Sequence, residues 1–509
     1  MKTATLFAVL TLLPGCLAAP SQILRIHPDN PKYFLFRGKP LFLLTATEHY
    51  GSVINRPFDF EKYLADAAVN GMTMTRTFLL FRELQSARNP SSPCKPESPD
   101  YIAPFPRTGP GKALDGEPRY DLDQWNPEYF DRLHRFLESA SRRGIVVELT
   151  IFSNTYADQI WALNPFRAKN NLQAVGDIEW QEYNTLKNQR LVERQVAYAR
   201  KIVQETAAFD NVYYEICNEP GGGFAGHATP ADVDEWQEHI GRVVGEEMAR
   251  LGRVHLIAGQ QAFSYKPEFR SPYDNAITGK LFDLVNVHPL PGTVFAGVTY
   301  QLGNFMSKEL MLDGISKFSR AMFPAPKPVI LDEDNTASIY RDLTGWTIHR
   351  KRAWTALLNA AHYDYIDFSI TVGSETGTRE SSAGLRSWMK HLSRFVADFD
   401  FVHAKPLPNV VLAAPANTLV SVLARSGESY AVYVADAREI NEPQAGRAIQ
   451  GKLALDLPAG RYALRLYSPV EGTFSPAILV DGKRGAEIDL APFRHDIALR
   501  LDRVPATGI

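Results

Sequence analysis

The sequence has little cysteine, no long apolar run after its first residues and no excess of either charge. Three cysteines among 509 residues are too few for a disulfide framework, and none has the spacing of a zinc site. We find no later stretch with the roughly 18 uninterrupted apolar residues of a membrane-spanning helix. The formal net charge of −2 argues against nucleic acid as the main partner. No glycine loop of the phosphate-binding type occurs in a strand–helix context, and no metal or organic cofactor is implied.

The first residues have the pattern of an export signal. Lys2 supplies a positive charge, an apolar stretch follows from Ala4 to Leu13, and small residues come next. The segment LPGC, which ends at Cys16, resembles a bacterial lipobox that would attach a lipid anchor to that cysteine, whereas cleavage after Ala18 would release a soluble protein. We predict a signal peptide over residues 1–19 and an exported protein that is periplasmic, an outer-membrane lipoprotein or extracellular.

From Ile23 to about Asp400, apolar runs of strand length alternate with amphipathic helical stretches. This alternation predicts an α/β fold, a (β/α)8 TIM barrel over residues 20–400. We expect its strands at 45–51, Met72–Leu80, Ile145–Phe152, Val212–Cys217, near Leu256, and at Leu284–Pro289, Pro328–Glu333 and Tyr365–Ile370. The segment from about Arg88 to Gln124 is rich in proline, glycine and serine, and it should be a loop on the catalytic face.

After about Phe401 the pattern changes to short strands of alternating polarity, such as LVSVLA, YAVYVA, KLALDL and DIALRL. Turn sequences such as Ser-Gly-Glu and Pro-Ala-Gly separate them. This pattern predicts a small antiparallel β-sandwich over residues 401–509. We expect the sandwich to pack on the barrel and mainly to support it.

Two of the apolar strands end in acidic residues. YYEICNEPGGG ends the fourth strand at Glu219, and KPVILDEDNT ends the seventh at Glu333. Either motif alone would also suit a solvated surface turn. Because the chemistry of a parallel barrel lies at the C-terminal ends of its strands, the two glutamates should face each other across the barrel mouth.

Cleavage of a glycosidic bond needs such a pair. One carboxylic acid protonates the leaving oxygen, and a second, ionised carboxylate attacks the anomeric carbon; in retaining enzymes the two groups lie about 5–5.5 Å apart. Arg76, at the end of the second strand, could hold Glu333 ionised, or it could simply bind a loop acid.

With these motifs the chain resembles clan A of the glycoside hydrolases, above all family 5 and its cellulase-like relatives. The matching features are TRTFLLF after the second strand, Asn218-Glu219-Pro220 after the fourth, His288 after the sixth and Glu333 after the seventh. They cover about Ile23 to Asp400. The segment YDLDQWNPEYFDRL is similar to bacterial glycosidases of this group. The C-terminal part resembles a β-rich module often labelled collagen-binding.

The resemblance implies a retaining double displacement on a β-linked oligosaccharide or glycoside, with Glu219 as acid/base and Glu333 as nucleophile. It implies that Asn218 binds the sugar 2-hydroxyl, that Arg76 supports the nucleophile, and that His288 lines the subsite of the cleaved sugar.

Two departures from family 5 leave the sugar open. Leu290 stands where these enzymes commonly have a tyrosine, and the eighth strand, FSITVG, lacks their usual tryptophan. The substrate of a cellulase is therefore not carried over. The sequence leaves open the linkage, endo or exo action, and the oligomeric state.

Other polar residues at the strand ends are weaker candidates for substrate binding: Glu48, His49, Asn154, Tyr156 and Gln260. For His49 a structural role fits equally well. Glu375, after the eighth strand, is a rival catalytic acid that we rank below Glu333. The alternative to an enzyme is a non-catalytic carbohydrate-binding or surface-adhesion protein on the same scaffold, and the intact pair of glutamates favours the enzyme.

Overall fold

The protein is described by a computed structural model that covers residues 23–48, 50–80, 82, 99–221, 227–262, 279–303, 309–334, 343–367, 369–370 and 375–505. The predicted signal peptide with Cys16, and the candidate His49, lie outside these described residues. Among the helices of the described ranges, none combines the length and the apolar character needed to cross a membrane.

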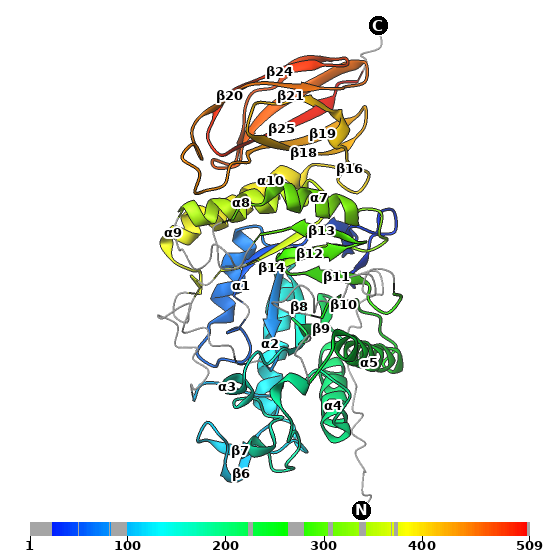
Figure 1. The fold of residues 1–509 in the computed structure, drawn as a ribbon, viewed down its shortest axis with the longest axis vertical. Helices are drawn as coiled ribbons and strands as arrows, with labels where there is room; N and C mark the ends of the chain where they lie inside the picture. The colour runs from blue at the N-terminus through cyan, green and yellow to red at the C-terminus, as the bar shows by residue number, and fades with distance from the viewer. Residues whose placement is uncertain are drawn as a thin grey trace, which may run out of the picture.

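Eight parallel strands form the centre of the molecule (Figure 1). They are β4 (Leu44–Thr47), β5 (Met74–Phe78), β8 (Val146–Ser153), β9 (Val212–Asn218), β10 (Ile257–Gln260), β11 (Leu284–Val287), β14 (Val329–Asp334) and β15 (His362–Ile366). Each strand from β5 onward pairs in parallel with the next, and β15 pairs with β4. The Thr73 amide donates to the Leu44 carbonyl at 3.0 Å and joins the two ends of this sheet. The predicted TIM barrel is confirmed.

The eighth strand begins earlier than predicted. β15 starts at His362, not at Tyr365, and ends at Ile366. His362 and Asp364 interrupt the apolar pattern at the true start of the strand, although both side chains are fully buried. The start of β15 was predicted too late because these two polar residues do not look like part of a buried strand.

Helices cover the outside of the barrel. They are α1 (Phe60–Val69), α2 (Pro127–Arg142), α4 (Gln189–Thr206), α5 (Pro230–Arg250), α7 (Leu312–Met322), α8 (Leu343–Leu357) and α10 (Ser387–Ala397), with the short α3 (Asp158–Trp161) and α9 (Arg379–Ser381). The starts of α2 and α5 follow sequence signals: Asn126 and Thr229 cap the two helices, each with a proline in the first turn. These caps fix where the chain leaves the loops of the barrel and returns along its outside.

Within the segment predicted as a loop, residues 107–120 form a β-hairpin, while the part up to residue 98 lies outside the described residues. Strand β6 (Arg107–Lys112) pairs antiparallel with β7 (Pro118–Tyr120). Glycines that suggested a loop instead supply the left-handed turn residues of the hairpin, such as Gly116 with φ 83°. Two further antiparallel pairings lie outside the barrel: β1 (Arg25–Ile26), β2 (Phe34–Phe36) and β3 (Lys39–Leu41), and then β12 (Pro291–Phe295) with β13 (Val298–Gln301).

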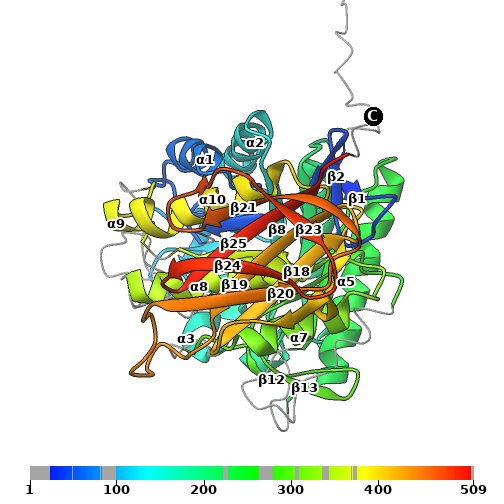
Figure 2. The same cartoon turned by 90° about the horizontal axis from the view of Figure 1, so that it is seen from above.

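The C-terminal region is built of antiparallel sheets, seen from above in Figure 2. The larger sheet contains β16 (Lys405–Pro406), β18 (Thr418–Arg425), β19 (Ser429–Asp436), β25 (Asp496–Arg503), β21 (Gly460–Ser468), β22 (Thr473–Phe474) and β23 (Ile478–Gly482). The smaller contains β17 (Val411–Ala413), β20 (Ile449–Leu455) and β24 (Ala486–Phe493). Apolar side chains of both sheets, including Val432, Leu453 and Leu499, form one buried core. The predicted antiparallel β-sandwich is confirmed.

The sandwich lies against α8 and α10 of the barrel (Figure 1). Arg350 of α8 donates two hydrogen bonds to Asp496 of β25, at 2.8 and 3.0 Å, and both side chains are buried. The ring of Trp354 stacks on Tyr433 of β19, with centroids 5.1 Å apart and an angle of 19°. Barrel and sandwich are thus joined by buried polar and aromatic contacts.

The buried His362 predicts a loss of stability in acid. Its Nδ1 accepts a hydrogen bond from the Leu43 amide and its Nε2 donates to the Lys32 carbonyl, so the fold requires the neutral ring. Burial lowers the pKa of His362 from 6.5 to about 3. Below pH 6.5 the unfolded chain therefore binds a proton that the fold does not. The contribution of this group to stability is complete above that pH and is lost as the pH falls toward 3, at up to about 1.4 kcal/mol per pH unit.

The variant His362→Asn tests this expectation. Its side-chain oxygen can still accept from Leu43, but the side chain does not titrate. We expect the free energy of unfolding, measured with urea at pH 5 and pH 7.5, to differ less between the two pH values in the variant than in the wild type. An equal difference in both proteins would contradict the assignment.

Candidate active site

Glu219 and Glu333 lie at the C-terminal ends of two barrel strands. Glu219 directly follows β9, and Glu333 is the penultimate residue of β14. Both have a positive φ, 43° and 56°, which is uncommon for residues other than glycine. Their exposed fractions are only 7% and 5%. Each strand therefore leaves extended geometry at its glutamate, and strained backbone of this kind clusters at functional sites.

The imidazole of His288, which follows β11, lies between the two carboxylates. Its Nδ1 is 2.7 Å from Glu219 Oε1 and its Nε2 is 3.5 Å from Glu333 Oε2. Burial opposes a charge on this ring, but Glu333, Asp332 and Glu219 together raise the pKa of His288 well above its usual value. The neighbouring carboxylates therefore favour the protonated form of the ring. One imidazole therefore bridges the two carboxyl groups at the same end of the barrel.

Glu333 is held by two further donors. The Tyr50 hydroxyl donates to Oε1 at 2.8 Å, and Arg76 donates to Oε2 at 2.7 Å. The Tyr50 ring stacks on Phe78 of β5, with centroids 4.8 Å apart and an angle of 6°. The carboxylate is thus fixed between a rigid phenol and a buried guanidinium.

Glu219 is held from the opposite side. The Tyr156 hydroxyl donates to its Oε2 at 2.5 Å, and its backbone amide donates to Gln260 Oε1 at 2.5 Å. Asn218 donates to the Tyr156 oxygen at 2.9 Å and accepts from Arg76 at 2.8 Å. A continuous chain of hydrogen bonds therefore runs from Glu219 through Tyr156, Asn218 and Arg76 to Glu333.

The structure brings most of the predicted site residues into this chain or next to it: Asn218, Arg76, His288, Tyr156 and Gln260. Asn154 contacts it from the side, because its Oδ1 accepts from the Tyr156 amide at 3.2 Å. Their contacts with a substrate stay predictions.

Glu48 and Glu375 have other partners. The two carboxylate oxygens of Glu48 accept from the amides of Tyr50 and Gly51, at 2.8 and 2.6 Å, and so shape the turn that carries Tyr50. Glu375 is 3.6 Å from the Lys62 ammonium and accepts from the Asp59 amide at 3.4 Å, at the start of α1. These contacts place Glu375 at the start of α1.

Sequence reasoning missed a buried layer of acids beside the pair. Its members are Glu148 of β8, Glu215 of β9, Asp332 of β14 and Asp364 of β15, all fully buried. Arg76 contacts three of them, with Glu215 at 2.6 Å, Asp332 at 3.4 Å and Glu148 at 3.8 Å. The available signal was acids inside otherwise apolar strands, as in VVELTIF and YYEIC.

Burial and mutual repulsion reduce the charge of this layer. Burial first, then Asp332 and Glu215, raise the pKa of Glu148 well above its usual value. Burial also raises the pKa of Asp332, and it raises that of Asp364 to about 6. Burial therefore favours the neutral forms of Glu148, Asp332 and Asp364.

Three of these acids have the donor types of a metal site. One oxygen each of Glu148, Glu215 and Asp332 lies within 4.8 Å of the others. The Arg76 guanidinium is already in contact with all three and supplies the positive charge there. These residues fit an internal ion-pair network better than a metal centre.

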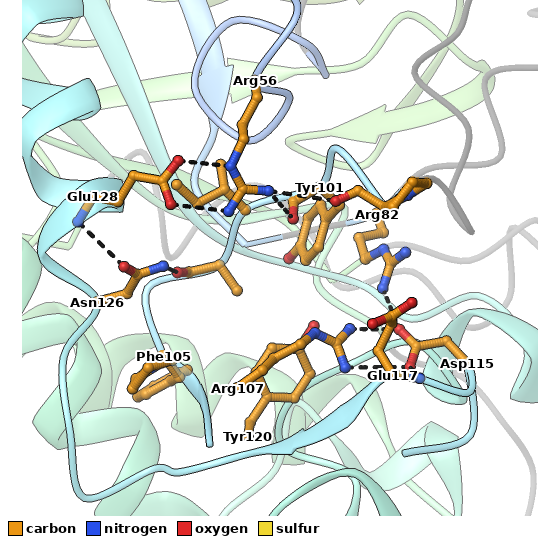
Figure 3. A pocket seen from close by; sticks show the side chains of 14 residues that line it. Arg56, Arg82, Tyr101, Phe105, Arg107, Asp115, Glu117, Tyr120, Asn126 and Glu128 are labelled. Atoms are coloured by element: carbon orange, nitrogen blue, oxygen red, sulfur yellow. Dashed lines mark hydrogen bonds and ion pairs between the residues drawn. The ribbon is translucent and has the colours of Figure 1, made fainter. Parts of the chain in front are cut away.

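A separate pocket of about 310 Å³ lies among the segments that follow β4 and β5 (Figure 3). Its arginines are paired within its own walls: Arg56 with Glu128 at 2.6 Å, and Arg82 and Arg107 with Asp115 at 2.9 and 2.5 Å. The pair of Arg82 with Asp115 joins the β6–β7 hairpin to the segment after β5, and that of Arg56 with Glu128 joins the segment after β4 to α2. The pocket shares no lining residue with the glutamate pair.

Comparison with known proteins places the fold. A family model described as a domain of unknown function, DUF6298, matches residues 94–205. A solved structure described as a glycoside hydrolase family 5 from Bacteroides vulgatus has a TM-score of 0.58 at 13% identity, and the match covers 97% of this chain and 96% of that one. Another, described as a glycoside hydrolase, has a TM-score of 0.56 at 14% identity and covers 96% and 98%. No curated protein matches. At such identities the likeness is one of fold, and it extends over both barrel and sandwich.

Removing the charge of Arg76 should destabilise the protein strongly. The variant Arg76→Gln leaves several buried carboxyl groups without their main counter-charge, and we expect the free energy of unfolding to fall by at least about 3 kcal/mol. Urea unfolding followed by circular dichroism at pH 7 measures this loss.

Arg425→Gln is the matched control. Arg425 is 46% exposed and pairs with Glu428 at 3.0 Å on the surface, so its loss should cost only about 0–1 kcal/mol. Equal losses in the two variants would mean that Arg76 does not compensate the buried acids.

Proposed function

We propose that this protein is a retaining glycoside hydrolase that cleaves a β-linked oligosaccharide or glycoside. Glu219 acts as the acid/base and Glu333 as the nucleophile. The observation that carries the proposal is the contact of one imidazole, His288, with both carboxylates at the ends of β9 and β14. Two carboxyl groups bridged by a single ring, on different strands at the barrel mouth, suit attack and protonation at a single glycosidic bond.

In the first step the Glu333 carboxylate attacks the anomeric carbon. The glycosidic C–O bond breaks, and Glu219, protonated at this stage, gives its proton to the departing oxygen. Arg76 and the Tyr50 hydroxyl, at 2.7 and 2.8 Å, keep the nucleophile oriented and favour its negative charge. The products of this step are a glycosyl ester on Glu333 and a released alcohol.

In the second step water cleaves the ester. Glu219, now ionised, takes a proton from the water as its oxygen attacks the anomeric carbon, and Glu333 leaves as a carboxylate. Two inversions at the same carbon give net retention. Tyr156 and His288, at 2.5 and 2.7 Å from Glu219, hold its carboxyl group in one orientation through both steps.

Several further features support a carbohydrate substrate. Two solved structures with a similar fold are described as glycoside hydrolases. Asn218 lies next to Glu219 and is oriented by Arg76 and Tyr156, which suits a contact with the sugar 2-hydroxyl. With the export signal expected in the first 19 residues, the enzyme would act outside the cytoplasm, either as a soluble protein or anchored by lipid at Cys16.

The variant Glu333→Gln should fold normally and lose turnover, because an amide cannot attack the anomeric carbon. A panel of nitrophenyl β-glycosides and polysaccharides identifies the substrate, and proton NMR of the early product should show the β-anomer. The control is Glu375→Gln, which removes the rival acid and should keep wild-type turnover. Wild-type activity in Glu333→Gln, or an α-anomer formed first, would contradict the proposal.

The loss of activity in the variant Glu219→Gln should depend on the leaving group of the substrate. We expect turnover of a substrate with a poor leaving group to fall by about 10²- to 10⁴-fold, because protonation of the departing oxygen is lost. A dinitrophenyl glycoside needs no such proton, so formation of the glycosyl ester should stay fast and only its hydrolysis should slow. The measurement is the pre-steady-state burst of dinitrophenolate. Equal losses of the first step for both substrates would exclude Glu219 as the acid.

A further inference from the structure

The strand that carries Glu333 is irregular at that residue. In the pairing of β14 with β15, Leu331 lies opposite Tyr363, but Asp334 lies opposite Tyr365, so the register shifts between them. Such a bulge changes the direction of side chains and is common beside active sites. It lets the neighbours Asp332 and Glu333 both contact Arg76, at 3.4 and 2.7 Å, which strict alternation would prevent.

Asp334, on the far side of the bulge, is buried and strongly bound. Its Oδ1 accepts from Arg352 of α8 at 2.7 Å, and its Oδ2 accepts from the Tyr363 hydroxyl at 2.7 Å. His349 Nδ1 is 3.4 Å from the same oxygen. Burial alone would raise the pKa of Asp334, but Arg352 and His349 hold it well below its usual range. We call Asp334, Arg352, His349 and Tyr363 the Asp334 anchor.

Helix α8 links this anchor to the C-terminal sandwich. Arg352 binds Asp334, while its neighbours Arg350 and Lys351 bind Asp496 and the Asp436 carbonyl of the sandwich, the latter at 2.8 Å. One helix therefore holds the strand of the glutamate on one side and the sandwich on the other.

A second link runs through the segment before α7. Arg352 donates to the Leu310 carbonyl at 3.3 Å. Glu439 of the sandwich accepts from the amides of Leu310 and Met311, at 2.5 and 3.0 Å. The sandwich thus contacts both the helix that carries Arg352 and a backbone group that orients it.

We propose that Asp334 and Arg352 are positioning residues for Glu333, and that the sandwich, through α8, is part of the device that keeps the bulge in place. The left-handed backbone of Glu333, with φ 56°, is unfavourable by itself and persists only where its surroundings hold it. Arg76 and Tyr50 hold the side chain, and the Asp334 anchor holds the next residue of the backbone. This inference rests on the proposed function, because the role of these residues is to position Glu333 as the nucleophile.

The variant Asp334→Asn tests the positioning role. The amide keeps the size of the side chain but loses the charge that binds Arg352. We expect kcat to fall by about 10- to 100-fold, because small misplacements of a reacting group cost this much, while KM changes little. The rate of inactivation by a 2-deoxy-2-fluoro glycoside, which reports attack by Glu333 directly, should fall in parallel.

Asp66→Asn is the matched control. Asp66 pairs with the buried Arg386 at 2.5 Å, elsewhere in the barrel. The Asp66→Asn substitution should lower the melting temperature without changing kcat or the inactivation rate of the folded enzyme. If Asp334→Asn behaves in the same way, the anchor is merely structural and the proposal is wrong.

A variant in the sandwich itself tests whether this domain contributes to the position of Glu333. Asp496→Asn breaks the bidentate contact with Arg350 and should lower kcat, by less than Asp334→Asn does, at unchanged KM. Glu487→Gln, which removes an exposed pair with Lys452, is the control and should have no effect. A wild-type kcat in Asp496→Asn would show that the sandwich does not help to position Glu333.

A crystal structure of Asp334→Asn separates this inference from the proposed function. The expected result is a Glu333 carboxylate displaced from Arg76 and Tyr50. If the wild type hydrolyses no glycoside but this displacement occurs, the positioning role holds and the proposed function fails. If the wild type is active and Glu333 stays in place in the variant, the positioning role alone is overturned.

Discussion

The fully buried guanidinium of Arg76 is the interaction on which the rest of the barrel interior depends. A buried charge costs several kcal/mol unless it is paired and hydrogen-bonded, so the arginine requires its acids as much as they require it. Its partners come from three other strands and are Glu148, Glu215, Asn218, Asp332 and Glu333. Strands β5, β8, β9 and β14 can satisfy this set in one register only, because a shift of one residue would turn each acid away from the interior.

The same network couples the two glutamates. His288 contacts both, and the chain of Arg76, Asn218 and Tyr156 joins them on a second path. The two carboxyl groups are therefore held in fixed positions relative to one another by shared partners.

The sequence predicts the barrel, the sandwich and the strand ends at Glu219 and Glu333, because apolar strands that end in polar residues are a local signal. The buried acids are harder to predict. Glu148 and Glu215 stand out within their strands, but the arginine that makes them tolerable is on β5, and only the folded chain brings the three together. The start of β15 was misplaced for the same reason, since His362 finds its partners at Leu43 and Lys32, far away in the sequence.

The directions of the side chains of Asp332, Glu333 and Asp334 cannot be predicted from the sequence. A period of two allows three consecutive acids at most two inward positions and says nothing of a bulge. In the structure each acid still needs a positive partner: Arg76 serves the first two and Arg352 the third. The second arginine is on α8, whose outer side is covered by the sandwich through Arg350 and Trp354. The C-terminal sheets therefore complete the surroundings of the helix that holds the strand of the glutamate.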